Sequence, residues 1–168
     1  QVKAFGGVDR LMKEKDKEWL KAVRIDPTAQ VITVGYSALI NIQDYSPTPS
    51  GFANKASWIA LNEVTQLGFD HNEILNEAID RLRNDLYIKP VGFELLPPQF
   101  TLHQLQSVYE AILDIELDKR NFRRKILKSG FLLETSHMQT GVPHKPAKLY
   151  EFNSSKFRKE EALFNTFY

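Results

Sequence analysis

Residues 30–42 carry the clearest hydrophobic pattern in the chain. Every second position from Ile32 to Ile42 is apolar, whereas the intervening positions are mostly small or polar. This alternation has the period of a β-strand and predicts a strand with one apolar face. Residues 56–61 predict a second strand. Residues 11–25 differ, because they are dense in charge with apolar positions at loosely helical spacing, and they predict an inserted helix or a mobile loop.

Three segments carry signals for the start of a helix. Asp70, Thr101 and Asp118 each follow an apolar residue and precede apolar positions at helical spacing, which is typical of an N-cap. Gln104 completes a capping box with Thr101, so this start is strongly marked. Gly130 predicts the end of the third helix, because glycine readily adopts the left-handed conformation found just after helices.

A hairpin is expected after the third helix. That helix should span residues 118–129, and the apolar residues 131–135 and 147–152 then predict two strands around a polar loop. Helix, short turn, helix and hairpin is the order of a winged helix-turn-helix DNA-binding domain. We therefore expect an α+β chain whose residues 101–168 form a winged helix domain, with residues 136–147 as the wing.

The expected second helix of this motif is strongly basic. Residues 119–128 include six Lys or Arg residues and no acidic residue. Phe122 and Ile126 share one helix face and should lie in the core, while Arg120, Asn121, Arg124, Lys125 and Lys128 fan over the opposite side. Arginine suits phosphates and guanine edges, and asparagine suits adenine. The plainer alternative is an ordinary solvated face. The residues expected to contact DNA are Lys119, Arg120, Asn121, Arg123, Arg124, Lys125 and Lys128 of the helix, with Lys145 and Lys148 of the hairpin.

The four histidines do not predict a metal site. They lack His-x-x-x-His spacing and a nearby set of carboxylates. His137 and His144 lie in the hairpin tip, where they are able to touch backbone phosphate. His71 and His103 lie in first helical turns and are expected to be surface or packing residues. No catalytic residue and no metal ligand is predicted, and cofactor-binding residues stay unassigned.

Composition and charge narrow the function classes. The chain has 168 residues, no cysteine and a net charge of +1. A disulfide framework, a thiolate zinc site and a cysteine nucleophile are therefore excluded, which suits the reducing cytoplasm where we expect the protein. No stretch approaches the roughly twenty apolar residues of a membrane span, so no membrane partner is expected. Residues 1–99 hold 11 basic and 13 acidic residues, whereas residues 100–168 hold 11 and 8.

Two groups of segments match known sequence patterns. Phe5-Gly6-Gly7-Val8-Asp9-Arg10, residues 31–40, Trp58 and Phe69-Asp70-His71 form the first group, and residues 95–102, 105–112 and 117–125 form the second. The first group resembles the C-terminal half of a Nudix domain. The second resembles the winged helix of the Nudix-related transcriptional regulators. The match covers nearly the whole chain, except residues 11–25 and the residues after Phe152.

The resemblance implies a domain organisation. Residues 1–89 would form the C-terminal part of a Nudix-type α/β/α sandwich, with an insertion at about residues 11–25. Residues 90–100, with three prolines and several large apolar residues, would form a docked connector. The winged helix would then occupy residues 101–168.

The resemblance also implies a function. Members of this family are ligand-responsive bacterial transcriptional regulators, in which the Nudix-like domain senses an ADP-ribose-like molecule or a sugar such as arabinose. The winged helix binds a double-stranded DNA operator, typically in a homodimer.

The chain departs from the Nudix pattern in one place. No segment matches the Nudix box, whose glutamates hold divalent metal ions, and the adjacent pair Glu160-Glu161 lacks the preceding Arg-Glu. The box is expected upstream of Gln1, so no cofactor is expected in this chain, and an ion such as Mg²⁺ would bind only if an upstream box is intact. Enzyme activity stays open, although a sensor is favoured.

Two alternatives to a regulator remain. The first is a Nudix hydrolase that acts on ADP-ribose or a related nucleoside diphosphate. The second is a winged helix used only for protein contacts, which the exposed cations expected at Arg120 and Arg124 argue against.

Overall fold

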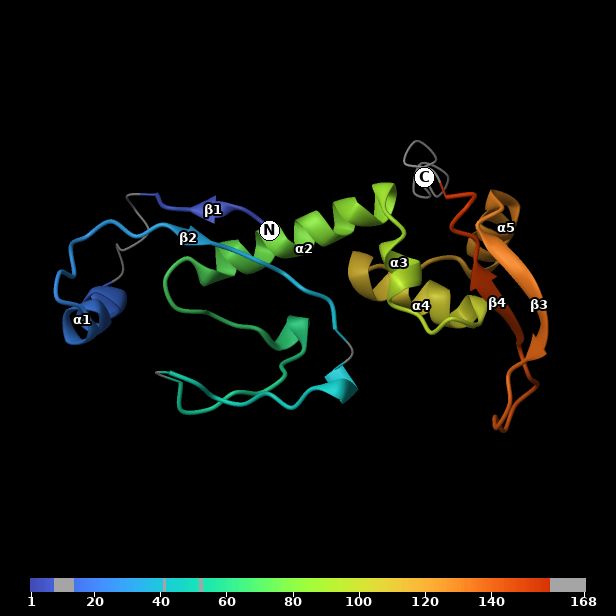
Figure 1. The fold of residues 1–168 in the computed structure, drawn as a ribbon, viewed down its shortest axis with the longest axis horizontal. Helices are drawn as coiled ribbons and strands as arrows, with labels where there is room; N and C mark the ends of the chain where they lie inside the picture. Colours follow the sequence, from blue (N-terminus) through green and yellow to red (C-terminus); the bar gives the residue numbers. More distant parts are fainter. Residues whose placement is uncertain (8–13, 41, 52, 158–168) are drawn as a thin grey trace. The chain divides into compact units, whose positions relative to one another are not determined.

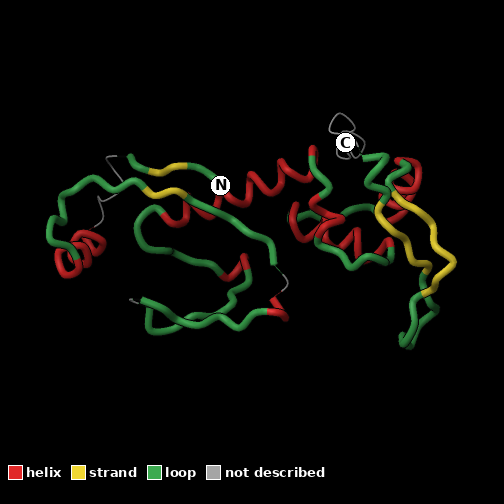
Figure 2. The backbone as a smooth tube through the Cα atoms, in the orientation of Figure 1, coloured by secondary structure: helices red, strands yellow, loops and turns green. Residues whose placement is uncertain are grey.

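The computed structural model describes residues 1–7, 14–40, 42–51 and 53–157 (Figure 1). The chain divides into two compact units, Gln1–Asp80 (unit 1) and Arg81–Tyr168 (unit 2), and the division falls inside one long helix, α2 (His71–Ile88). Both units combine helices with a two-stranded antiparallel sheet, so the predicted α+β class is confirmed (Figure 2). The domain boundaries expected at residues 89 and 100 stay a prediction, because compact units need not coincide with domains.

Unit 1 contains a small sheet. Strand β1 (Ala4–Phe5) pairs with strand β2 (Thr33–Val34), with Phe5 opposite Thr33. Two further backbone hydrogen bonds extend the pairing, from the Val2 nitrogen to the Gly35 oxygen at 2.8 Å and from the Gly35 nitrogen to the Lys3 oxygen at 2.9 Å. The sheet therefore involves only the first residues of the chain and one short segment.

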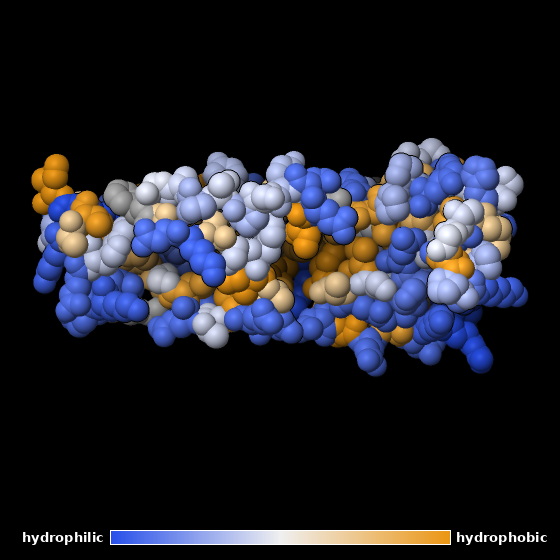
Figure 3. Space-filling model, turned by 90° about the horizontal axis from the view of Figure 1, so that it is seen from below, coloured by the Kyte–Doolittle hydropathy of each residue, from blue (hydrophilic) through white to orange (hydrophobic). Residues whose placement is uncertain are grey.

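The predicted strands of unit 1 are mostly wrong. Of residues 30–42 only β2 is a strand, and residues 56–61 lead into a short 3-10 helix, η3 (Leu61–Glu63); a second one, η2, spans Ile42–Asp44. A strand persists only where its backbone can pair with a neighbour, and within the described part of unit 1 only β1 supplies one. The expected apolar face consequently stays exposed at Ile32, Val34, Tyr36, Ala38, Ile40 and Ile42, and hydrophobic residues are visible on the molecular surface (Figure 3).

The charge-dense insertion contains a helix, α1 (Glu14–Val23), which agrees with the inserted helix that was one of the two expectations for this segment. Residues 11–13 lie outside the described residues. Its buried Asp16 carboxylate accepts a hydrogen bond from the Phe69 nitrogen at 3.1 Å. Phe69 has a φ of 53°, and its ring meets that of Trp19 edge-on at 5.7 Å. These two contacts attach helix α1 to Phe69, which lies two residues before the start of α2.

Three of the four helices after Asp70 begin where the sequence signals place them. Helix α2 begins one residue after Asp70, and the short helix α3 (Val91–Glu94) follows it. Helix α4 (Leu102–Leu113) has the predicted capping box: Thr101 accepts from the Gln104 nitrogen at 3.1 Å and its own nitrogen donates to the Gln104 side chain at 2.8 Å.

Helix α5 (Lys119–Ser129) is capped at both ends as predicted. The Asp118 carboxylate accepts a hydrogen bond from the Asn121 nitrogen at 2.7 Å, which satisfies one of the unpaired amides of the first turn. Gly130 ends the helix with a φ of 76°, in the left-handed region that favours glycine.

The predicted hairpin is confirmed. Strand β3 (Leu132–Met138) pairs antiparallel with β4 (Lys148–Phe152), and the register shifts between Glu134 and Met138. Tyr150 of β4 also pairs with Phe100 just before α4, through reciprocal backbone hydrogen bonds of 3.0 and 2.8 Å. The segment before α4 therefore continues the sheet on the other side of β4.

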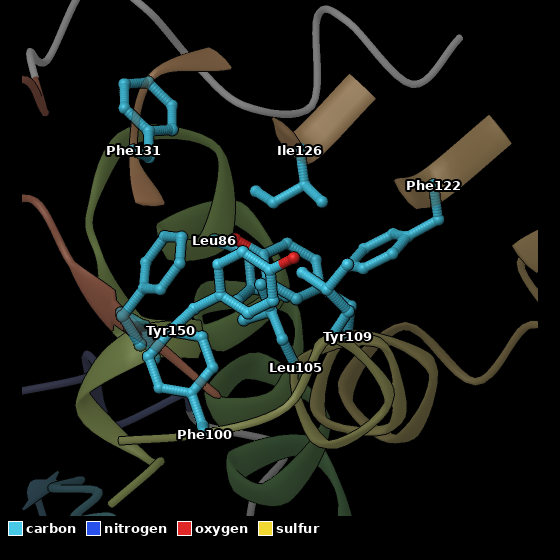
Figure 4. Packing of buried hydrophobic residues seen from close by; sticks show 11 residues of the cluster. Leu86, Phe100, Leu105, Tyr109, Phe122, Ile126, Phe131 and Tyr150 are labelled. Carbon is cyan, nitrogen blue, oxygen red and sulfur yellow. The ribbon is translucent and has the colours of Figure 1, made fainter. Parts of the chain in front are cut away.

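The core of unit 2 joins all its elements (Figure 4). Tyr109 of α4 and Phe122 of α5 meet edge-on at 5.9 Å, and Phe93 of α3 stacks on Phe152 of β4 at 4.3 Å. The fully or nearly fully buried members are Leu86, Val91, Phe93, Phe100, Leu102, Leu105, Tyr109, Phe122, Ile126, Phe131 and Tyr150. The expected connector is thus part of this core. No helix within the described ranges has the length and apolar character needed to cross a membrane.

Replacing Gly92 with alanine should destabilise unit 2. A Cβ at this position would lie 2.5 Å from Cε2 of the buried Tyr109 ring, so α3 or the ring must move. We expect Gly92→Ala to lower the free energy of unfolding by about 1–3 kcal/mol, measured by urea denaturation followed by circular dichroism. The control is Gly68→Ala, where no atom lies within 4 Å of the added Cβ. Equal stability of both variants and the wild type would contradict the tight contact.

Candidate nucleic-acid interface

Helix α5 separates an apolar face from a basic one. Phe122 and Ile126 are 2% and 0% exposed and anchor the helix in the core. At about 100° per residue, Arg120, Arg124 and Lys128 lie opposite these two positions, whereas Lys119 lies near the direction of Ile126 in the first turn. Lys119, Arg120, Arg123, Arg124 and Lys128 are exposed, and Asn121 and Lys125 are half-buried. The structure therefore brings together the seven helical residues that the sequence predicted as DNA contacts.

Asn121 and Arg124 form a pair on this face. The Arg124 Nη2 donates to the Asn121 Oδ1 at 2.7 Å, one helical turn away. An asparagine that reads adenine needs its carbonyl oxygen to accept from the base and its amide to donate. The Asn121 oxygen has two lone pairs, so this contact occupies one of its two acceptor positions and leaves the other.

The last turn of α5 borders a depression of about 610 Å³. Its described lining consists of Arg124, Lys125, Lys128 and Ser129. Three cations around one concave surface attract an anionic group, since their potentials add.

The hairpin residues have different surroundings. Lys145 is exposed in the loop between the strands, where the Gln139 nitrogen donates to the Ala147 oxygen at 2.8 Å. Lys148, at the start of β4, forms an ion pair with Glu134 of β3. This hydrogen bond raises the pKa of the Lys148 ammonium. Lys148 is consequently charged but already engaged by a carboxylate.

A hydrogen-bond network fixes the turn between α4 and α5. The Gln106 amide donates to the Glu110 carboxylate at 2.8 Å and to the Leu117 oxygen at 2.9 Å, while the Leu117 nitrogen donates to Glu110 at 3.0 Å. Asp114 ends α4 in the left-handed conformation, with a φ of 57°. This network determines the direction in which α5 leaves the turn.

Sequence reasoning missed these positioning residues. Gln106 is buried, and its spacing from Glu110 is the i, i+4 separation at which Gln and an acidic residue pair on a helix. That local signal was present in the sequence. Glu134 carried no comparable signal, because its partner Lys148 is 14 residues away on the other strand.

No metal centre accompanies the basic face. Among the described residues, no group of three or more His, Cys, Asp or Glu side chains is placed to hold a metal ion.

The helix–turn–helix with its hairpin defines a winged helix domain, and comparisons with known proteins agree. Residues 92–152 match the model of the family described as the NrtR DNA-binding winged helix domain. Residues 92–152 therefore form a winged helix domain of the NrtR family, and the resemblance to the Nudix-related regulators is confirmed.

Individual relatives share this region. The ADPR responsive transcriptional repressor NtrR of Acinetobacter baylyi is 36% identical over 129 residues, which is 76% of this chain and 51% of the relative. The chain thus spans about half the length of the curated relative that it matches. Two crystal structures of Shewanella oneidensis NrtR are also similar to this chain. The structure complexed with a 27mer DNA has 30% sequence identity and a TM-score of 0.46, and the match covers 54% of this chain and 41% of that one. The second structure of the same protein has 32% sequence identity and a TM-score of 0.43, and the match covers 52% of this chain and 39% of that one.

Removing the charge of Glu110 should change how the free energy of unfolding depends on pH. The hydrogen bond from the Leu117 backbone, followed by that from Gln106, lowers the pKa of the Glu110 carboxyl. Since the folded-state pKa lies below the unfolded one, this stabilisation is present above the unfolded-state pKa and is lost as the pH falls through the lowered pKa. We expect Glu110→Gln to be less stable than wild type at neutral pH, with a difference that shrinks in acid.

The measurement is the urea denaturation midpoint as a function of pH. Glu116→Gln, an exposed position in the same turn, is the control and should follow the wild-type curve. A constant difference between Glu110→Gln and wild type at every pH would show that the charge of Glu110 contributes nothing.

Proposed function

We propose that this chain is the DNA-binding part of a ligand-responsive transcriptional regulator. Helix α5 enters the major groove of double-stranded operator DNA, and the wing contacts the phosphate backbone. The observation that carries this proposal is the basic face of α5, opposite the buried Phe122 and Ile126, in the second helix of a helix-turn-helix.

The roles of the basic residues follow from their chemistry. Arg120 and Arg124 carry planar guanidinium groups suited to guanine edges or to phosphates, while Lys119, Lys125 and Lys128 act as point charges toward the backbone. Arg123 and Asn121 complete the helix face, Lys145 belongs to the wing, and Lys148 follows it at the start of β4. The description of the matching family as DNA-binding supports this assignment of the domain.

The effector and the assembly are part of the same proposal. The A. baylyi relative is described as ADPR responsive and as a repressor, which supports an ADP-ribose-like effector over a sugar. Two copies of the chain would place two α5 helices in successive major grooves of a two-fold operator, and a homodimer is therefore proposed. A change in the separation of these helices would alter DNA affinity only if the effector binds the two arrangements unequally.

Removing either arginine of α5 should weaken DNA binding. We expect Arg120→Ala and Arg124→Ala each to cost about 1–3 kcal/mol of binding free energy. The salt slope, which is the slope of log affinity against log salt concentration, should become shallower by about one for each phosphate contact that is lost. The measurement is fluorescence anisotropy with a duplex selected from a random library, at several salt concentrations. Lys15→Ala, an exposed cation on α1, is the control for net charge. Unchanged affinity and slope in both arginine variants would refute the proposal.

Freeing Lys148 should strengthen binding. The Glu134 carboxylate forms an ion pair with the Lys148 ammonium, so a DNA phosphate must compete with Glu134 for this cation. We expect Glu134→Gln to bind DNA more tightly, with a salt slope steeper by about 0.9 for one added phosphate contact. The measurement is the same titration, repeated in a Lys148→Ala background as a double-mutant cycle. An equal gain in that background would mean that Glu134 acts through net charge and not through Lys148.

A further inference from the structure

His137 lies in β3 and is held by a chain of hydrogen bonds that spans three segments. Its Nδ1 lies 3.0 Å from the Oε1 of Gln99, the residue before Phe100. The Gln99 Nε2 in turn donates to the Glu151 carboxylate of β4 at 2.9 Å. Gln99 therefore bridges both strands of the wing.

The hydrogen bonds from His137 through Gln99 to Glu151 determine which nitrogen of the neutral His137 ring carries the proton. An ionised carboxylate only accepts hydrogen bonds, so the amide nitrogen of Gln99 must face Glu151. The amide oxygen of Gln99 then faces His137, and an oxygen acceptor requires a proton on the Nδ1. In the neutral imidazole the Nε2 is consequently the unprotonated nitrogen, and it becomes a donor only in the imidazolium form.

The backbone of His137 is fixed as well. Its nitrogen donates to the Thr135 Oγ1 at 3.1 Å, and that hydroxyl donates to the Leu149 oxygen across the hairpin at 2.8 Å. These contacts lie at the register shift between Glu134 and Met138. The residue is exposed, and no described residue hydrogen-bonds to its Nε2. The ring is thus held on one side and open to an external partner on the other.

We propose that His137 is a phosphate-binding residue of the wing that contacts DNA only as the imidazolium, so that DNA binding takes up a proton. A phosphate oxygen is an acceptor and has no proton to give to a neutral Nε2. The proposal rests on the proposed DNA-binding function. It assigns to the His137–Gln99–Glu151 chain the role of keeping the neutral form from binding phosphate.

The other charged groups of the wing do not reproduce this behaviour. Glu134 and Lys148 form an ion pair with each other, and Glu151 reaches His137 through Gln99. The remaining charged or titratable side chains of the two strands and their loop are Tyr150, His144 and Lys145. Of all these groups only the histidines ordinarily titrate between about pH 5 and pH 8. His144, in the loop, is therefore the necessary control.

The first test is the pH dependence of DNA affinity. The full chain and a selected duplex are titrated by fluorescence anisotropy from about pH 8 to about pH 5.5 at constant salt. We expect wild-type affinity to rise about tenfold for each wing that takes up one proton as the pH falls from about 8 to about 6, and so about a hundredfold for the proposed homodimer. In His137→Gln the side-chain amide donates at every pH, so its affinity should be nearly independent of pH. His144→Gln should keep the wild-type profile.

The outcomes separate this inference from the proposed function. A wild-type profile in His137→Gln, or a flat profile in the wild type, overturns the role of His137 while DNA binding stands. Failure of the wild type to bind any duplex at any of these pH values overturns the proposed function itself.

The second test reads the tautomer directly. Long-range ¹H–¹⁵N NMR of the labelled full chain without DNA distinguishes the protonated from the unprotonated ring nitrogen. We expect the proton of neutral His137 on the Nδ1, as the Gln99 amide requires. A proton on the Nε2 would overturn the proposal, because the neutral ring could then donate to phosphate.

Discussion

The burial of one face of α5 is the constraint on which the winged helix depends. Phe122 and Ile126 pack against the side chains of α4, including the ring of Tyr109. A helix buried along one face has a fixed orientation about its axis, so the side on which each cation leaves the helix is fixed as well. The close approach of Gly92 to Tyr109 limits how α3 packs on this core, and the Gln106–Glu110 network fixes the turn that leads into α5. The basic face is therefore a product of core packing as much as of composition.

The wing combines two kinds of charged contact. In the first, Lys148 is held by Glu134 within the hairpin, so a phosphate must displace an internal anion. In the second, the Gln99 Oε1 lies 3.0 Å from the His137 Nδ1, which in the proposed tautomer leaves the Nε2 of the neutral ring without a proton. Both arrangements make the free domain less attractive to DNA than its number of basic residues indicates. Such restraint favours binding at sites where many contacts form together over loose binding anywhere on a polyanion.

The sequence predicted local features well and long-range ones poorly. The caps at Thr101 and Asp118 and the stop at Gly130 were readable because each involves residues no more than a few positions apart. The expected strand over residues 30–42 was wrong, because alternation records a preference while a strand needs a partner, and β1 pairs with only two of its residues. The basic residues of α5 were predictable as a group. The Gln99–His137 and Gln99–Glu151 contacts were not, since they join positions 38 and 52 residues apart.

The pairing of Phe100 with Tyr150 has a mechanical consequence. It ties the residue before the N-cap of α4 to the middle of β4 by two backbone hydrogen bonds, and Tyr150 is also buried in the core. Bending the hairpin at its base would break sheet hydrogen bonds and core contacts at once. The loop beyond Met138 is held less firmly, because the hydrogen bond from the Gln139 nitrogen to the Ala147 oxygen is the last that continues the pairing of β3 and β4 among the described residues. We therefore expect the hairpin to change shape most readily in residues 140–146, which hold none of these core contacts.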